Sequence, residues 1–160
     1  MHIESTRFGR VDVRDDSVIT FPKGLIGLPG TRYVLLAQDE GSAFYWLHSV
    51  DDPAIALPVA NPWLFFADYE VEVSDEDVRT VGLSGAADAD IFCVVRATDR
   101  LDDFTINLRG PLVMNGQTRV AVQTINEAGD YPVRQPLFAA ADAASAAPST
   151  PAVPVAATGV

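Results

Sequence analysis

The sequence predicts an all-β fold: a small β-barrel-like domain with one short helix and a disordered C-terminal tail. Three observations lead to this prediction. Short runs rich in β-branched and aromatic residues recur along residues 1–138, separated by Gly, Pro, Asn and Asp, as in sheets that close on themselves or pack on a second sheet. Helical periodicity is nearly absent from the same residues. After Phe138 the composition changes to mostly Ala, Pro, Ser, Thr and Val.

The first expected strands occupy residues 10–14 and 18–21. Residues 10–14 alternate polar and apolar side chains, and Asp15-Asp16-Ser17 is a turn signal, so the two runs together predict a β-hairpin. Pro58 lies in a later strand and predicts an edge position or a bulge there, because proline cannot donate a hydrogen bond to the ladder. The next three strands are expected at residues 32–37, 44–50 and 55–59.

A short helix is expected in the middle of the chain. Residues 70–73 alternate again, and Ser74 then caps a helix whose first turn holds acids that suit its dipole. Gly82 predicts the end of this helix. The apolar run at 91–97 predicts a central strand that is buried on both faces. The remaining strands are expected at residues 104–108, 111–114, 119–125 and 131–137.

The change of composition after Phe138 predicts a domain boundary. From Ala139 to Val160, Asp142 is the only charged residue, and repeated prolines interrupt any helix. We expect one domain at residues 1–138, since a chain of 160 residues needs no second core. Residues 139–160 are expected to form a disordered Ala/Pro-rich tail.

Charge limits the partners that the chain is expected to bind. The net charge of −11 would repel phosphate backbones, so we expect no direct nucleic-acid binding and favour a basic protein partner, although acidity that serves only solubility remains an alternative. Cys93 is the single cysteine and suits a reducing cytosol. Residues 1–6 resemble no signal peptide, and no apolar stretch approaches a membrane span. The sequence therefore predicts a cytoplasmic protein that is not in a membrane.

The residues that catalysis or metal binding requires are scarce. His48, Ser49 and Asp51 can be written as a triad, but neighbours on a strand point to opposite faces, so a solvated, loop-facing His48 is the simpler expectation. One Cys and two His residues can hardly hold zinc. The paired acids match no calcium loop and are explained by turns and helix starts. We expect no enzyme activity, no cofactor and no metal.

Aromatic and acidic residues are concentrated in one third of the chain. Trp63-Leu64-Phe65-Phe66 follows Pro62 and places apolar groups at consecutive positions, so one face of this run is a candidate for protein docking. Packing of the same rings in the core is the alternative, and it stays open. The candidate partner-binding residues of this region are Trp63, Phe65, Phe66, Asp68, Tyr69, Asp75, Glu76 and Asp77.

Six motifs stand in order along residues 1–137. The motifs are Thr6-Arg7-Phe8-Gly9, Phe21-Pro22-x-Gly24-Leu25-x-Gly27, Phe44-x-Trp46-Leu47-x-Ser49, Asp68-Tyr69, Thr105-x-Asn107-Leu108-x-x-Pro111-x-x-x-Asn115 and Tyr131-x-x-Arg134-x-Pro136-Leu137. In this order and spacing they resemble the FliW family of flagellar assembly factors. Asn107 and Asn115 match family positions and complete the candidate set, although Asn beside a Pro-bearing turn more often satisfies backbone hydrogen bonds.

The resemblance implies a small β-barrel-like fold and two protein partners. Members of this family bind cytoplasmic flagellin, and they bind the translational regulator CsrA away from its RNA-binding surface. The chain would then act as a chaperone for flagellin, and the protein freed by flagellin export would antagonise CsrA and relieve repression of flagellin synthesis. We expect a monomer.

Two other classes of function remain alternatives. A small-ligand or carbohydrate-binding β-barrel is the first, since stacked rings and nearby carboxylates can hold a polar ligand. An enzyme is the second. A ligand site requires a concave pocket with convergent polar groups, whereas protein docking requires a flatter patch of several hundred Å².

Overall fold

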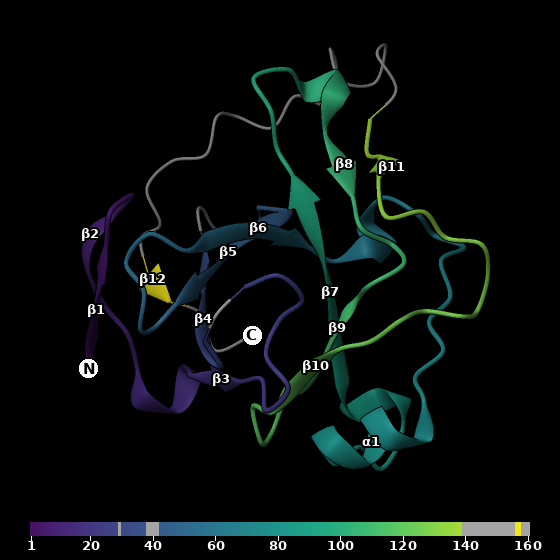
Figure 1. The fold of residues 1–160 in the computed structure, drawn as a ribbon, viewed down its shortest axis with the longest axis horizontal. Coiled ribbons are helices and arrows are strands. Elements are labelled where there is room, and N and C mark those ends of the chain that lie inside the picture. The colour runs from purple at the N-terminus through teal and green to yellow at the C-terminus, as the bar shows by residue number, and fades with distance from the viewer. Residues whose placement is uncertain (29, 38–41, 139–155, 158–160) are drawn as a thin grey trace.

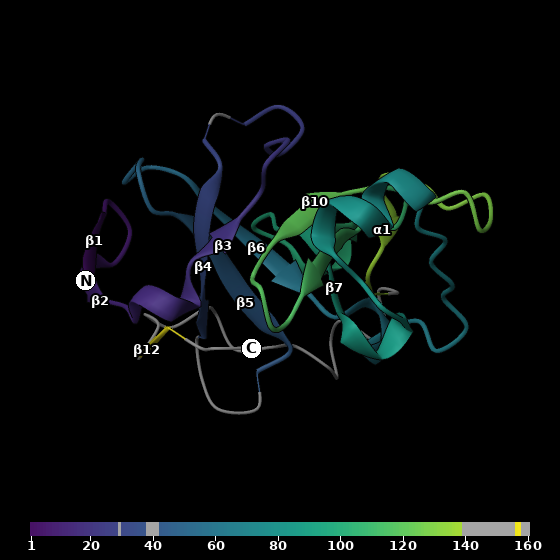
Figure 2. The same cartoon turned by 90° about the horizontal axis from the view of Figure 1, so that it is seen from below.

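The computed structural model describes residues 1–28, 30–37, 42–138 and 156–157. Its centre is one antiparallel sheet, and Figures 1 and 2 show that β4 to β6 run across the direction of β7. The strand order is β3 (Ile19–Thr20), β4 (Arg32–Ala37), β5 (Phe44–Ser49), β6 (Ala56–Ala60), β7 (Ala89–Arg96), β9 (Leu112–Asn115) and β10 (Ala121–Gln123).

The two outer strands of this order, β3 and β10, approach each other without forming a regular ladder. A single parallel bridge joins Thr20 to Val120. There the backbone N–H of Thr20 donates to the carbonyl oxygen of Arg119 at 2.8 Å. The sheet is therefore barrel-like but not closed by continuous strand pairing, which confirms the predicted mainly β, barrel-like class.

The main hydrophobic core lies on the concave side of this sheet. Every one of the seven strands contributes a buried side chain to it: Ile19, Tyr33, Leu35, Leu47, Val59, Phe92, Leu112, Met114 and Ala121. The cavity left between these side chains is about 10 Å³. Such a space is too small for any ligand larger than a single water, so side chains fill the interior.

The expected hairpin between residues 10–14 and 18–21 is wrong. Instead, β2 (Gly9–Asp12) pairs with β1 (His2–Ser5), while β3 pairs with β4. The turn signal forms the 3₁₀ helix η1 (Asp15–Ser17), in which the hydroxyl of Ser17 donates to the carbonyl oxygen of Arg14 at 2.6 Å. This turn leads the chain from the β1–β2 hairpin into the central sheet. The hairpin is held there by Ile3 and Val13, which are buried against the outer face of β4.

Strand β7 occupies the centre of the sheet, as the apolar run predicted. It pairs with β6 and β9, and at its Arg96 end it also pairs with β8 (Thr105–Ile106). The outer neighbour of β8 is β11 (Gln135–Pro136), and the 3₁₀ helix η4 (Leu101–Asp103) connects β7 to β8.

Pro58 lies where β6 pairs with β5 alone, since pairing with β7 begins at Val59, which fits the predicted edge position.

The predicted helix is confirmed as α1 (Asp75–Val81). The hydroxyl of Ser74 accepts a hydrogen bond from the backbone N–H of Asp77 at 3.2 Å, and Gly82 ends the helix with a φ of +72°. The segment 70–73 is extended but pairs with no strand, because the backbone N–H of Glu72 donates to the side chain of Asn126 instead. Figures 1 and 2 place α1 and the β1–β2 hairpin on opposite sides of the molecule.

Most of the expected C-terminal tail, residues 139–155 and 158–160, lies outside the described residues. Two of its residues are described: β12 (Ala156–Ala157) pairs antiparallel with Leu36 and Ala37 of β4. No described helix is long and apolar enough to cross a membrane.

Candidate protein-docking cleft

An apolar cleft of about 520 Å³ lies beside α1, and we call it the α1 cleft. Its walls come from α1, the segment 70–74, the start of β7 and the 3₁₀ helices η2 (Pro62–Leu64) and η3 (Ala86–Asp88). The apolar side chains that line it include Trp63, Val71, Val73, Val78, Leu83 and Ile91.

The alternation at residues 70–73 builds one wall of the α1 cleft. In an extended segment, successive side chains point to opposite sides. Val71 and Val73 therefore line the cleft, while Glu70 and Glu72 are exposed to solvent. The four consecutive residues thus place apolar side chains in the cleft and acidic side chains on the opposite, solvent-facing side.

Trp63 lines the α1 cleft and keeps 39% of its surface exposed. The turn before it is fixed by Asn61, whose side chain accepts a hydrogen bond from the backbone N–H of Trp63 at 2.9 Å. The indole N–H donates to the carbonyl oxygen of Tyr69 at 2.7 Å, and the two rings are 5.6 Å apart. These contacts hold the indole in place, so the cleft wall exists before any partner arrives.

Tyr69 is buried beneath this wall and positions it. The Tyr69 hydroxyl donates to the carbonyl oxygen of Leu108 at 2.5 Å and accepts from the side-chain amide of Asn126 at 3.2 Å. Burial raises the pKa of the Tyr69 phenol above its usual range, so the hydroxyl keeps its proton and remains a donor. Tyr69 therefore supports the cleft from beneath its surface.

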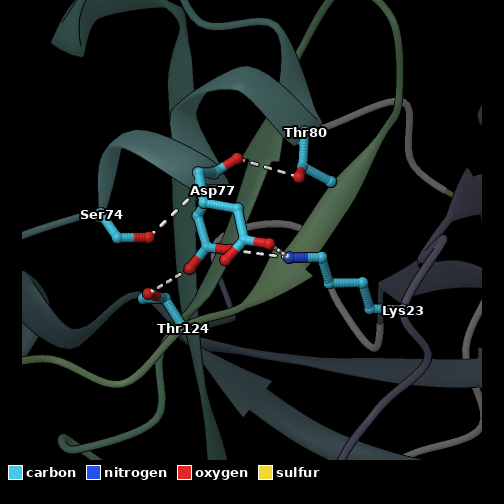
Figure 3. Close-up of polar contacts among 6 residues, drawn as sticks. Lys23, Ser74, Asp77, Thr80 and Thr124 are labelled. Carbon is cyan, nitrogen blue, oxygen red and sulfur yellow. Dashed lines mark hydrogen bonds and ion pairs between the residues drawn. The ribbon is translucent and has the colours of Figure 1, made fainter.

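The three predicted acids of α1 have different environments, and Figure 3 shows Asp77 between Lys23 and Thr124. The Asp77 carboxylate is only 14% exposed, accepts from the Thr124 hydroxyl at 2.7 Å and lies 3.5 Å from the Lys23 ammonium. Glu76 is 73% exposed and also contacts Lys23, at 3.3 Å, and Asp75 is exposed. The hydrogen bond from Lys23 to Glu76 is the main cause that raises the pKa of this lysine. Asp75 and Glu76 can therefore meet a partner, whereas Asp77 ties α1 to Lys23 and to Thr124, the residue after β10.

The other aromatic candidates face the interior. Phe65 and Phe66 are half-buried against a second core, under β7 and β8, and the Phe65 ring is 5.8 Å from the rings of both Phe44 and Phe138. Asp68 is exposed. Core packing thus accounts for Phe65 and Phe66, while Trp63 and its exposed neighbour Leu64 remain on the surface.

Asn107 and Asn115 satisfy backbone groups. The buried Asn115 amide donates to the carbonyl oxygens of Val81 and Gly82 at 3.1 and 3.2 Å, which fixes the C-terminus of α1 on the β9–β10 turn. The Asn107 side chain accepts from the backbone N–H groups of Arg109 and Gly110. Both side chains therefore satisfy backbone hydrogen bonds, which is the alternative role given for them above.

The expectation of a solvated His48 is wrong. His48 lies on β5, is fully buried, and its Nδ1 is 2.7 Å from the carbonyl oxygen of Ser49. The Ser49 hydroxyl accepts from the backbone N–H groups of Asp51 and Asp52, so no triad forms.

Burial raises the pKa of the Cys93 thiol to about 12, which leaves it protonated and unreactive. Within the described ranges, no group of three or more His, Cys, Asp or Glu residues could hold a metal.

Sequence analysis missed the lining side chains Val78 and Leu83. Gly82 ends α1 in a Schellman motif, in which the backbone N–H of Leu83 donates to the carbonyl oxygen of Val78 at 3.1 Å. A hydrophobic contact often joins the residues at these two positions. An apolar residue directly after a helix-ending glycine was therefore a usable signal for this wall of the cleft.

Comparison with known proteins identifies one family. The model of the FliW protein family matches residues 2–137. A flagellar assembly factor FliW from Magnetococcus marinus is 39% identical over 140 residues, which cover 86% of this chain and 85% of the relative. The flagellar assembly factor FliW from Natranaerobius thermophilus is 35% identical over 140 residues, which cover 86% of this chain and 93% of the relative.

A solved structure agrees with the sequence comparisons. The crystal structure of a flagellar assembly factor FliW aligns with a TM-score of 0.79 and 27% identity, over 86% of this chain and 97% of that one. The likeness covers most of both chains and confirms the resemblance that the six motifs indicated. The chain belongs to the FliW family of flagellar assembly factors.

Proposed function

We propose that this chain is a non-enzymatic, monomeric, cytoplasmic assembly factor that binds flagellin as a chaperone and binds and antagonises CsrA. Flagellin occupies the chain until it is exported, and the freed chain then captures CsrA and relieves repression of flagellin synthesis. The shared name of its relatives supports a role in flagellar assembly. The α1 cleft is the observation that supports protein docking.

The chemistry of the α1 cleft suits a partner segment with an apolar stripe and basic flanks. Its walls are apolar, whereas the segment 70–74 and α1, which form two of these walls, carry the exposed acids Glu70, Glu72, Asp75 and Glu76. An amphipathic helix docks its apolar face into a groove of this kind. These acids and the net charge of −11 would raise the association rate of a basic partner more than the final affinity. We therefore assign the α1 cleft to a basic surface of CsrA.

The competing small-ligand function has less support. Among the described residues, the cavity between the core side chains of the barrel is about 10 Å³, which is too small for the ligand of a lipocalin-type barrel. The α1 cleft is large enough for a small molecule, but its lining offers the hydroxyl of Ser84 and an indole N–H that Tyr69 already occupies. A ligand site needs several convergent polar groups.

Calorimetric titration with flagellin and CsrA from the same organism, singly and in competition, tests the proposal. We expect tight binding to both, displacement of CsrA by flagellin, and weaker CsrA binding at moderate salt than at low salt. Binding to neither partner by a folded chain would overturn the proposal and favour the small-ligand function.

A pair of matched variants tests the assignment of the α1 cleft. Asp75→Lys with Glu76→Lys reverses two exposed acids beside the cleft, and we expect CsrA binding to weaken about tenfold or more. Asp12→Lys with Asp99→Lys changes the net charge equally at two exposed acids elsewhere. An equal loss in both double variants would show that only overall charge matters, and the cleft assignment would fail.

A further inference from the structure

A second, smaller cleft of about 180 Å³ lies at the other end of β7 and is distinct from the α1 cleft. We call it the arginine cleft, and its lining consists of Val94, Arg96, Thr105, Asn107, Val133 and Arg134. Figure 1 shows β8 and β11 beside this end of β7, far from α1.

Strand register brings the two arginines to the same face of the sheet, on strands that flank β8. Arg96 of β7 is the partner of Thr105 in β8, and the backbone N–H of Asn107 donates to the carbonyl oxygen of Val94 at 2.9 Å. On the other side of β8, Gln135 is paired with Ile106, which places Arg134 next to the row of Asn107. Because side chains alternate along strands, residues 94, 96, 105, 107 and 134 share one face.

The two guanidinium groups of the arginine cleft lack acidic partners. Elsewhere in this acidic chain, Arg14 contacts Asp16 at 2.6 Å and Arg100 contacts Asp102 at 3.1 Å. Within the described part of the chain, neither Arg96 nor Arg134 forms an ion pair or a side-chain hydrogen bond. A bound anion in the cleft that both residues line would supply the counter-charge that these guanidinium groups lack.

The surroundings of these guanidinium groups favour a carboxylate on a short aliphatic stem. A guanidinium presents a planar fork of donors that matches the two oxygens of a carboxylate. Thr105 adds a half-buried hydroxyl to the same face. Val94 and the 53% exposed Val133 supply apolar surface, which the methylene groups of a glutamate side chain can contact and a free phosphate cannot.

We propose that the arginine cleft binds a glutamate side chain in an acidic segment of a partner protein. The cleft is small enough to take one or two side chains, so it recognises a short segment and not a folded surface. This function goes beyond the proposed docking at the α1 cleft, because it requires a ligand of the opposite charge on a different face.

An NMR titration of the ¹⁵N-labelled chain tests the proposal with a defined probe. The probe is the blocked peptide acetyl-Gly-Glu-Ser-Glu-Gly-amide, and its twin has glutamine in place of both glutamates. We expect saturable shifts of the backbone N–H signals of Arg96, Thr105 and Arg134 and of both guanidinium Nε–H signals with the glutamate peptide only. Equal shifts with the glutamine twin would overturn the proposal.

Variants and a free anion complete the test. Arg96→Gln with Arg134→Gln should weaken binding of the glutamate peptide about tenfold, since charged hydrogen bonds are lost. Both arginine side chains are exposed, so the fold should persist. Arg79→Gln with Arg109→Gln removes two exposed arginines outside the cleft and should leave binding unchanged. Inorganic phosphate that shifts the same signals as strongly as the peptide would reveal a general anion site and refute the assignment.

Discussion

The two ends of β7 carry surfaces of opposite character. At the Ala89 end, Ala89 and Ile91 line the apolar α1 cleft, and α1 beside it carries the exposed acids Asp75 and Glu76. At the Arg96 end, Val94 and Arg96 line the arginine cleft. The odd-numbered residues face one side of the strand and the even-numbered residues face the other, so the two clefts open on different faces.

This difference shows how one central strand can serve two binding surfaces. Side chains of the α1 cleft are fixed by buried hydrogen bonds, through Tyr69, Asp77 and Asn115. The two guanidinium groups of the arginine cleft are exposed and form no such bonds with described residues. Changes at the α1 end should therefore affect stability and binding together, whereas changes at the arginine end should affect binding alone.

The largest effect on stability is expected for Tyr69→Phe, because Tyr69 connects the regions of both clefts. Its carbonyl oxygen accepts from Trp63 of the α1 cleft, and its hydroxyl donates to Leu108, next to Asn107 of the arginine cleft. Removal of the hydroxyl leaves the Leu108 carbonyl without this donor, which should lower the free energy of unfolding by about 2 kcal/mol. Urea denaturation measures the change, and a loss below about 0.5 kcal/mol would contradict the role assigned to Tyr69.

Alkaline pH should destabilise the middle of β7, where Cys93 is buried. Burial raises the pKa of this thiol from 9.0 to about 12, so between these values the folded chain holds a proton that the unfolded chain has lost. The contribution of the protonated Cys93 thiol to the free energy of unfolding is therefore fully present below pH 9 and is lost as the pH rises toward 12. We expect a loss of about 1 kcal/mol between pH 8 and pH 10 in urea denaturation. Cys93→Ala should flatten this slope, and an unchanged slope would assign it to other groups.

Two neighbouring acids of α1 should differ in their effect on stability. Asp77→Asn removes the charge from a carboxylate that contacts Thr124 and Lys23, so we expect a loss of about 1 kcal/mol in the free energy of unfolding. Asp75→Asn changes an exposed carboxylate and should cost less than about 0.5 kcal/mol. Thermal denaturation of both variants makes the comparison, and equal losses would refute the distinction.

The helix was predicted from sequence more completely than the pairing of the strands. Ser74 and Gly82 act on their own backbone neighbourhood, so a local pattern was sufficient to place both ends of α1. The hairpin prediction failed because β3 pairs with β4, and that choice depends on which faces are buried in the complete fold. His48 was placed wrongly for the same reason, since its burial on β5 is a tertiary property.

The candidate site was predicted in part. The sequence identified Trp63, Asp75 and Glu76, which lie at or beside the α1 cleft, because aromatic and acidic residues cluster there. The sequence did not show that Trp63 is on the surface while Phe65 packs in the core. The turn of η2 decides which of the two rings faces the core. The arginine cleft gave no sequence signal, because Arg96 and Arg134 are far apart in the chain and meet only through the pairing of β7, β8 and β11.

The smallest expected effect is an influence of the arginine cleft on binding at the α1 cleft. Arg96→Gln with Arg134→Gln makes the chain more acidic, so the long-range attraction of a basic partner should increase slightly. The two ends of β7 are separated by more than a Debye length of about 8 Å at physiological salt, since β7 has eight residues. We therefore expect the association rate of CsrA to rise less than about twofold at low salt and to be unchanged at physiological salt. Stopped-flow measurements at both salt concentrations can detect this, and a large fall in the rate would mean that the two clefts bind one partner together.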